Sequence, residues 1–154
     1  MRTIQLKYIA LAVVVAMLGM GGCKPKNAAS AVDAGAAEKA YVAPGKYDEF
    51  YNFVSGGFSG QMSVYGLPSG RLLRVIPVFS VDPEKGWGYS EETKPMLNTS
   101  HGIVPWDDLH HTELSQTNGE IDGRWIFANG NNTPRIARVD LGTFRTNEII
   151  EIPN

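Results

Sequence analysis

Residues 123–140 read GRWIFANGNNTPRIARVD and give the strongest indication of fold class. Arg124–Asn129 combines aromatic and β-branched residues, which predicts a strand. The glycine and asparagines at 130–133 predict a turn, and Arg135–Asp140 predicts a second strand. A third strand is expected at Glu148–Ile152. Short strands joined by turns indicate an all-β fold.

Residues 60–80, GQMSVYGLPSGRLLRVIPVFS, repeat this scheme. Two apolar runs flank Leu67–Gly70, in which a proline at the second position and a glycine at the fourth suit a β-turn. The segment therefore predicts a β-hairpin.

The two segments align loosely, with Gly60 matching Gly123 and Arg74-Val75 matching Arg138-Val139. A meander that recurs at a long interval suggests blades of a β-propeller, although two unrelated hairpins of a β-sandwich would look similar. The interval exceeds an ordinary blade, and the extra length between the hairpins contains residues 106–111, WDDLHH.

Charge is spread unevenly over the 154 residues, whose formal net charge is −2. Residues 1–45 carry five Lys/Arg and two Asp/Glu, which leaves nine and fourteen for residues 46–154, a net charge of −5. An acidic body lacks the basic surface that nucleic acid requires, so no nucleic-acid partner is expected.

The N-terminus predicts export. Residues 1–22 contain two early basic residues, a twelve-residue apolar run and Gly21-Gly22, so they are expected to form a signal peptide. The single cysteine, Cys23, follows directly, as at a bacterial lipoprotein cleavage site where the thiol is lipidated. The alternative is a plain signal peptide that happens to end at a cysteine. Lipidation would place the protein in the periplasm or cell envelope, anchored to a membrane.

Composition divides the remainder into two parts. Residues 23–45 are rich in alanine and lack an apolar stripe, which indicates a lipoprotein-type tether. Residues 46–154 are expected to form the folded β-domain.

Two of the three histidines, His110 and His111, are adjacent. Neighbouring side chains of a strand point to opposite faces, so the pair can serve one site only if the backbone bends or if the site holds several metals. Neutral imidazole binds zinc, copper and iron, and Asp107 or Asp108 could accept the other ring N–H. The alternative is a surface loop with two ordinary polar histidines. A lone zinc or copper carrier would need His101 as a third ligand.

Other polar and aromatic residues are expected to be structural. Trp87 and Trp125 are predicted core aromatics between sheets, and Glu113, Glu120 and Asp122 are predicted solvated charges on turns. No nucleophile motif is present, so no catalytic side chain is predicted.

Residues 107–154, DDLHHTELSQTNGEIDGRWIFANGNNTPRIARVDLGTFRTNEIIEIPN, strongly resemble the N-terminal part of nitrous oxide reductase. The matching elements are the Asp-x-His-His segment at 108–111, Ser115–Gly119, Asp122–Arg124 and the arginine strand Asn132–Arg138. The upstream RVIPVFSVDPEKGWGYSEETKPML is also similar, and the signal without a twin-arginine pair fits one lineage of the family. Ile121, where the family has tyrosine, and Pro134 depart from its pattern.

The resemblance implies a seven-bladed propeller followed by a cupredoxin domain, in a homodimer that reduces N2O to N2 and water. It implies a four-copper sulfide cluster held by seven histidines, a two-copper centre in the C-terminal domain, and calcium in the full-length enzyme. His110 and His111 match two cluster ligands, and Asp108 matches a carboxylate that orients an imidazole. The implied electron donor is a c-type cytochrome or a cupredoxin.

Residues 46–154 are therefore expected to be the first blades of an incomplete propeller, and the chain an N-terminal fragment of a denitrification enzyme. With two of the seven ligands, the fragment alone is expected to be inactive. The alternative function is a non-enzymatic exported lipoprotein β-domain that acts as a binding module.

Overall fold

The computed structural model describes residues 34–153, so the predicted signal peptide and the lipidation site Cys23 lie outside the described residues. The chain contains two compact units that divide between Glu38 and Lys39, and each is considered by itself. The helix α2 (Ala34–Ala40) lies within the predicted tether. Within residues 34–153, no helix combines the length and apolarity needed to cross a membrane.

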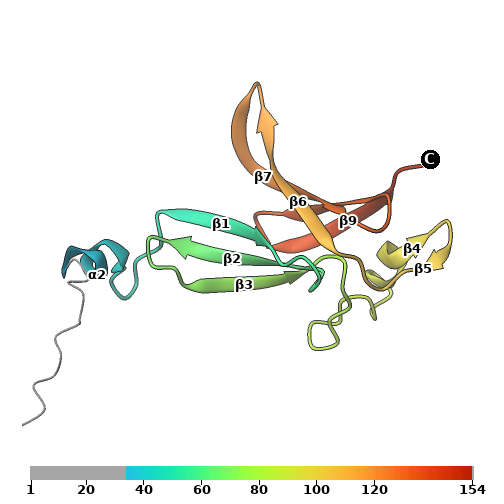
Figure 1. The fold of residues 1–154 in the computed structure, drawn as a ribbon, viewed down its shortest axis with the longest axis horizontal. Helices are drawn as coiled ribbons and strands as arrows, with labels where there is room; N and C mark the ends of the chain where they lie inside the picture. The colour runs from blue at the N-terminus through green and yellow to red at the C-terminus, as the bar shows by residue number, and fades with distance from the viewer. Residues whose placement is uncertain (1–33, 154) are drawn as a thin grey trace, which may run out of the picture. The chain divides into compact units, whose positions relative to one another are not determined.

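The second unit is built from antiparallel strands, which confirms the all-β prediction (Figure 1). Its elements are β1 (Phe50–Ser55), β2 (Gln61–Leu67), β3 (Leu72–Pro77), the 3-10 helix η1 (Lys94–Leu97), β4 (Asn98–Thr99), β5 (Gly102–Ile103), β6 (Leu109–Thr117), β7 (Glu120–Gly130), β8 (Arg135–Asp140) and β9 (Arg145–Glu151).

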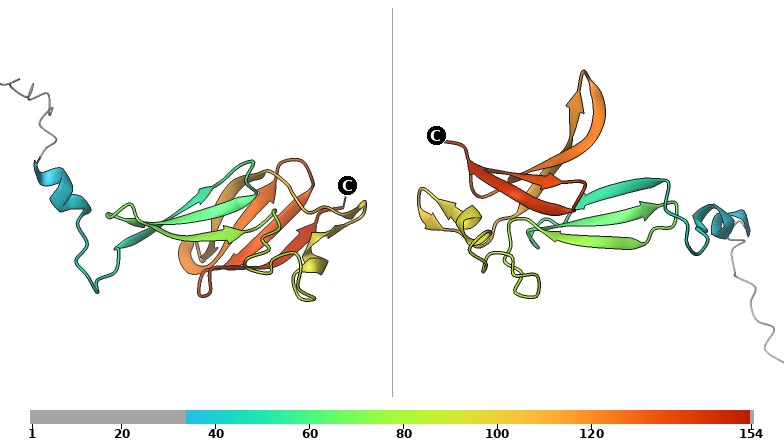
Figure 2. Two further views of the ribbon diagram at one scale, coloured as in Figure 1. Left: turned by 90° about the horizontal axis from the view of Figure 1, so that it is seen from below. Right: turned by 180° about the vertical axis from the view of Figure 1, so that it is seen from behind.

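Two meanders form the body of this unit. Strands β1-β2-β3 make a three-stranded sheet and β6-β7-β8-β9 a four-stranded sheet, each with neighbouring strands in chain order. The short β4-β5 hairpin belongs to the long connection between them. Only residues 125–129 of β7 pair with β8, so the rest of the β6-β7 hairpin extends beyond the sheet (Figures 1 and 2).

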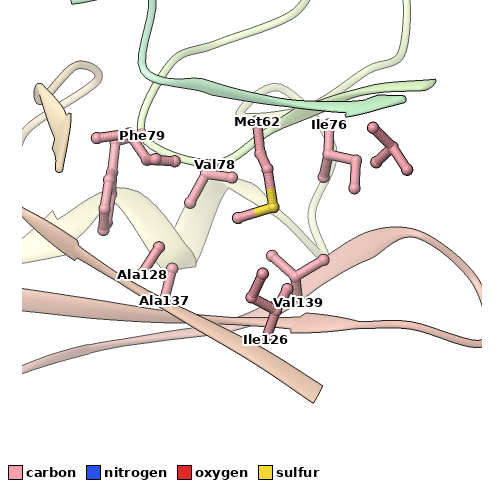
Figure 3. Close-up of a cluster of buried hydrophobic side chains, with 10 residues drawn as sticks. Met62, Ile76, Val78, Phe79, Ile126, Ala128, Ala137 and Val139 are labelled. Atoms are coloured by element: carbon pink, nitrogen blue, oxygen red, sulfur yellow. The ribbon is translucent and has the colours of Figure 1, made fainter. Parts of the chain in front are cut away.

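A shared core joins the two meanders. Side chains of β2 and β3 point toward those of β7 and β8 (Figure 3). Burial alternates along β2 and β8, as expected for strands with one face on a core and the other more accessible. The buried cluster comprises Met62, Val64, Ile76, Val78, Phe79, Leu109, Ile126, Ala128, Ala137 and Val139.

Most predicted strands are confirmed. The second strand, Arg135–Asp140, has the predicted bounds, and the predicted hairpin within residues 60–80 is β2-β3. The first and third strands are longer than predicted, and β1 and β6 were not predicted at all.

Several predictions about single residues are wrong. Glu113 and Glu120 are exposed, as predicted, but lie in β6 and β7 and not on turns. Trp125 is not a core residue, because it is only partly buried and its ring faces the guanidinium of Arg138 at 4.5 Å. Asp122 lies inside β7, where its carboxylate accepts hydrogen bonds from Ser115, Thr117 and the backbone N–H of Arg124. Trp87 is buried, as predicted, but lies outside the cluster shared by the meanders.

Candidate metal centre

The histidine pair lies at the start of β6 and not in a loop. Both side chains are exposed, whereas the preceding Leu109 is fully buried in the core. Leu109 also forms a bridge with Gly57, and its carbonyl accepts a hydrogen bond from the hydroxyl of Ser55. Packing of Leu109 and these backbone contacts fix the position from which the histidines project.

A β-bulge places His110 and His111 side by side. Leu109 pairs with Gly130 and Thr112 with Ala128, so both histidines lie opposite the single residue Asn129. The extra residue interrupts the alternation of side chains between the two faces of the strand, so that the side chain of the bulged residue points in a new direction. The two imidazole rings consequently lie with their centroids 4.1 Å apart, at 55° to each other. The bend that a shared site requires is therefore present.

Asn129 holds the bulge in place. Its side-chain oxygen accepts a hydrogen bond of 3.0 Å from the backbone N–H of His111, and its amide nitrogen donates to the carbonyl of Gly130. Neither imidazole forms a hydrogen bond to another residue within the described chain, so the ring nitrogens are available as ligands.

Asp108, the predicted orienting carboxylate, is buried beside this site. Within residues 34–153 its carboxylate accepts a hydrogen bond from the side-chain amide of Asn131 at 3.3 Å, and its carbonyl accepts one from the Asn131 backbone at 2.9 Å. The proposed contact with an imidazole stays a prediction.

Asp107, the other candidate, has a structural role. It is fully buried and forms an ion pair with Arg135 at 3.4 Å. Its carboxylate also accepts hydrogen bonds from the backbone N–H groups of Asn132 and Thr133, at 2.9 and 3.0 Å, and from both side chains. These contacts tie the segment before the histidines to the turn between β7 and β8.

Electrostatics agree with this role. Burial raises the pKa of Asp107, but hydrogen bonds from Thr133 and Asn132 and the charge of Arg135 outweigh burial and hold it below its ordinary value. Arg135 is further held by the carbonyl of Val104, at 3.0 Å, and lies over the ring of Phe79. A charged pair buried in this way needs all these partners, because an unpaired buried charge is strongly unfavourable.

The third histidine does not join the pair. His101 is exposed between β4 and β5, and within residues 34–153 no three His, Cys, Asp or Glu side chains come together as a metal site. The lone-carrier hypothesis therefore finds no support in the described part of the chain.

An aromatic pair next to the aspartates was not predicted. Trp106 stacks on Phe58, with ring centroids 6.2 Å apart and planes 2° apart, and its indole N–H donates to the Phe58 carbonyl at 2.7 Å. Both rings are exposed. Their sequence positions are 48 residues apart, so no local pattern could indicate the contact.

The chain is similar to several curated proteins. It is 41% identical to the nitrous-oxide reductase of Pseudomonas fluorescens over 119 residues, which are 77% of this chain and 18% of that protein. It is 38% identical to the enzyme of Stutzerimonas stutzeri over 117 residues, 76% of this chain and 18% of that protein. For the Cupriavidus necator enzyme the identity is 34% over 164 residues, with 96% of this chain and 26% of that protein covered.

No family model matches the chain. The chain spans only about a fifth to a quarter of the length of these relatives, consistent with the N-terminal portion that its motifs indicate. The resemblance identified from residues 107–154 is confirmed: this chain is a homologue of the nitrous-oxide reductases and corresponds to a portion of their sequence.

Proposed function

We propose that this chain forms part of a multicopper nitrous oxide reductase and supplies His110 and His111 as ligands of its catalytic copper cluster. The observation that carries the proposal is the bulge, which brings two consecutive imidazoles to one exposed place. An ordinary strand would direct them to opposite faces. Similarity to nitrous-oxide reductases over most of the chain supports the same conclusion.

His110 and His111 are suitable copper ligands, but they form only part of a complete ligand set. Imidazole nitrogen is a suitable copper ligand, and both rings are exposed without competing hydrogen bonds inside the described chain. Two imidazoles do not make a complete site, so the remaining ligands come from other parts of the enzyme. When bound, the cluster would supply the two electrons that, together with two protons, convert N2O to N2 and water.

This chain's own residues position the ligands. Asn129 holds the backbone of His111, and the Asp107–Arg135 pair holds the segment before it. We propose that Asp108, buried immediately before Leu109, orients an imidazole so that one ring nitrogen faces the metal. The 154-residue chain by itself does not reduce N2O under this proposal, since it supplies two of the seven ligands that the family resemblance implies.

The propeller is the proposed setting for this site. The four-stranded meander β6-β7-β8-β9 has the strand number and order of a propeller blade, and its face packs on the neighbouring meander through a shared core. The aligned arginines support equivalence of the two meanders, because Arg74 lies in β3 of the β2-β3 hairpin and Arg138 lies in β8 of the β7-β8 hairpin. The cupredoxin domain, calcium, the homodimer and the electron donor belong to the proposed complete enzyme.

A chimeric enzyme tests the proposal. Residues 47–153 would replace the matching segment of the Pseudomonas fluorescens nitrous-oxide reductase. The chimera is expected to bind copper and reduce N2O. His110→Ala or His111→Ala should remove cluster copper and activity, whereas His101→Ala, which changes an exposed histidine outside the pair, should leave both unchanged.

Retention of cluster copper and activity in both His110→Ala and His111→Ala chimeras would overturn the ligand assignment. In that case the binding-module hypothesis would become the better account of this chain.

Export and lipidation are part of the proposed cellular setting. We propose that residues 1–22 direct export and that Cys23 carries the lipid, with residues 23–45 as the tether to the β-domain at 46–154.

A further inference from the structure

A cavity of about 410 Å³ lies away from the histidine pair. It is lined by β3, by the connection that follows it, and by Phe144, Arg145 and Thr146 at the start of β9. Thr146 joins the two sheets here through a buried hydrogen bond of 2.8 Å to the carbonyl of Pro77. The volume is within the range of small-molecule sites, roughly 300–1,000 Å³.

Basic side chains outnumber acidic ones in the lining of this cavity. Arg74, Lys85 and Arg145 line it, against the single carboxylate of Glu92. The charge of the lining is opposite to that of the β-domain as a whole, because residues 46–154 contain nine Lys/Arg and fourteen Asp/Glu, a net charge of −5. Positive charges gathered in a concave site attract anions.

Two of these cations are available to a ligand. Lys85 is already paired with Asp82 at 2.6 Å, but neither Arg74 nor Arg145 forms an ion pair or side-chain hydrogen bond within residues 34–153. Asp140 lies opposite Arg145 in the register of β8 and β9, yet its carboxylate accepts hydrogen bonds from Thr143 instead.

A buried donor in the same lining is also without an acceptor. Trp87 is 6% exposed, and its indole N–H has no hydrogen-bond partner within residues 34–153. Its backbone is fixed by two hydrogen bonds with Asp82, of 2.9 and 3.0 Å. Trp87 is therefore a fixed part of the cavity lining, and its indole signal can report on a ligand there.

We propose that this cavity binds a small organic carboxylate with an apolar body. Arg74 and Arg145 neutralise the carboxylate, since guanidinium groups pair with planar oxyanions through two parallel hydrogen bonds. The lining residues Val75, Phe144 and Trp87 contact the apolar body of the ligand. This site does not depend on the copper proposal.

Benzoate is the probe for this site, with benzyl alcohol as the uncharged control. The full 154-residue chain, labelled with nitrogen-15, contains three tryptophans, whose indole N–H signals can be followed separately by NMR. Benzoate is expected to shift the Trp87 indole signal saturably, while benzyl alcohol shifts it much less.

Arginine variants then test the charge contacts. Arg74→Gln and Arg145→Gln are each expected to weaken benzoate binding about tenfold, as loss of a hydrogen bond to a charged group predicts. Arg145→Lys, which keeps the charge but loses the planar donor pair, should weaken it less. Arg124→Gln is the matched control, because Arg124 is an exposed arginine on β7 outside the cavity.

Three results would overturn the proposal: no saturable shift with benzoate, equal shifts with benzyl alcohol, or unchanged affinity in both glutamine variants. A shift produced by an acidic peptide but not by benzoate would also overturn it, in favour of a protein contact at this surface. A dispersed amide spectrum for each variant establishes that it is folded before its affinity is compared.

Discussion

At the scale of single residues, the Asp107–Arg135 ion pair is the interaction in the described chain whose charges are most completely removed from water. Both side chains are fully buried, and Asp107 also accepts several hydrogen bonds from Asn132 and Thr133. Two adjacent aspartates therefore have different tasks: one holds the fold, and the next is left beside the histidines. Because these contacts occupy both carboxylate oxygens, Asp107 is unavailable to a metal site.

Asp107→Asn is expected to destabilise the chain by about 3–5 kcal/mol, because it leaves the charge of Arg135 buried without its partner. Urea denaturation followed by tryptophan fluorescence measures the loss. Glu148→Gln is the control, since it breaks the exposed Arg138–Glu148 pair of 3.1 Å and should change stability by no more than about 1 kcal/mol. Equal effects of the two substitutions would contradict the structural role of Asp107.

At the scale of elements, close backbone packing decides how the β1-β2 connection meets the rest of the fold. Gly60 has φ +65°, and its carbonyl accepts hydrogen bonds from the N–H groups of Val78 and Phe79. A Cβ at Gly60 would lie 2.6 Å from the Phe79 carbonyl oxygen, so no other residue fits without movement of the backbone. Gly70 has a similar φ of +69°, but a Cβ there would meet nothing within 4 Å.

This difference gives a matched test. Gly70→Ala should cost about 1–2 kcal/mol, the ordinary penalty of a left-handed conformation for alanine. Gly60→Ala carries the same penalty and should cost about 1–3 kcal/mol more, because the added methyl group overlaps the Phe79 carbonyl. Thermal or urea unfolding of both variants separates the two contributions. Similar losses for the two would show that the loop relaxes around Gly60.

Strands and turns that are determined by the residues within one short segment could be predicted from the sequence. Arg135–Asp140 alternates regularly, and its predicted bounds are confirmed to the residue. The hairpin around Leu67–Gly70, predicted without strand bounds, is confirmed as β2-β3. The β6-β7 hairpin also carries a local sequence signal: Asn118 and Gly119 have φ of 55° and 83°, and Asn-Gly is the characteristic pair for such a two-residue turn.

The arrangement of the candidate site could not be predicted in the same way. The histidines are neighbours because two residues of β6 lie opposite Asn129 of β7, and this register depends on pairing between distant residues. Which aspartate forms the buried ion pair with Arg135 likewise depends on the turn at 131–134, which folds back onto Asp107. The sequence supplied the candidate residues, but long-range contacts determine their geometry.

At the scale of the whole molecule, anchoring is the first testable property. If Cys23 is lipidated, Cys23→Ala should move the exported chain from the membrane fraction to the soluble fraction and abolish labelling by radioactive fatty acid. Under the proposal, the acyl chains and not the acidic β-domain hold the protein at the bilayer. Membrane association that persists without acyl labelling would contradict lipidation as the anchor.

Acid sensitivity is the second property of the whole molecule, because stabilised carboxylates are distributed over both meanders and the connection between them. Hydrogen bonds and cations hold the pKa of each below its ordinary value; the five are Asp48, Asp82, Asp107, Asp122 and Glu151. A carboxyl whose pKa is lower in the folded than in the unfolded state stabilises the fold above the unfolded pKa. That stability is lost as the pH falls through the folded pKa.

The free energy of unfolding should therefore be nearly constant from pH 7 to about 5, and should fall steadily below pH about 4 as these carboxylates become protonated. Urea midpoints measured across this range test the expectation. Asp48→Asn removes one contributor, which accepts hydrogen bonds from Ser69 and Arg71, so this variant should lose less stability between pH 7 and pH 3 than the parent. If the parent retained its neutral-pH stability at pH 3, the pKa values of these carboxyl groups would not be lowered by folding. The hydrogen bonds assigned to them, including those of Asp107 that position the histidine segment, would then have to be revised.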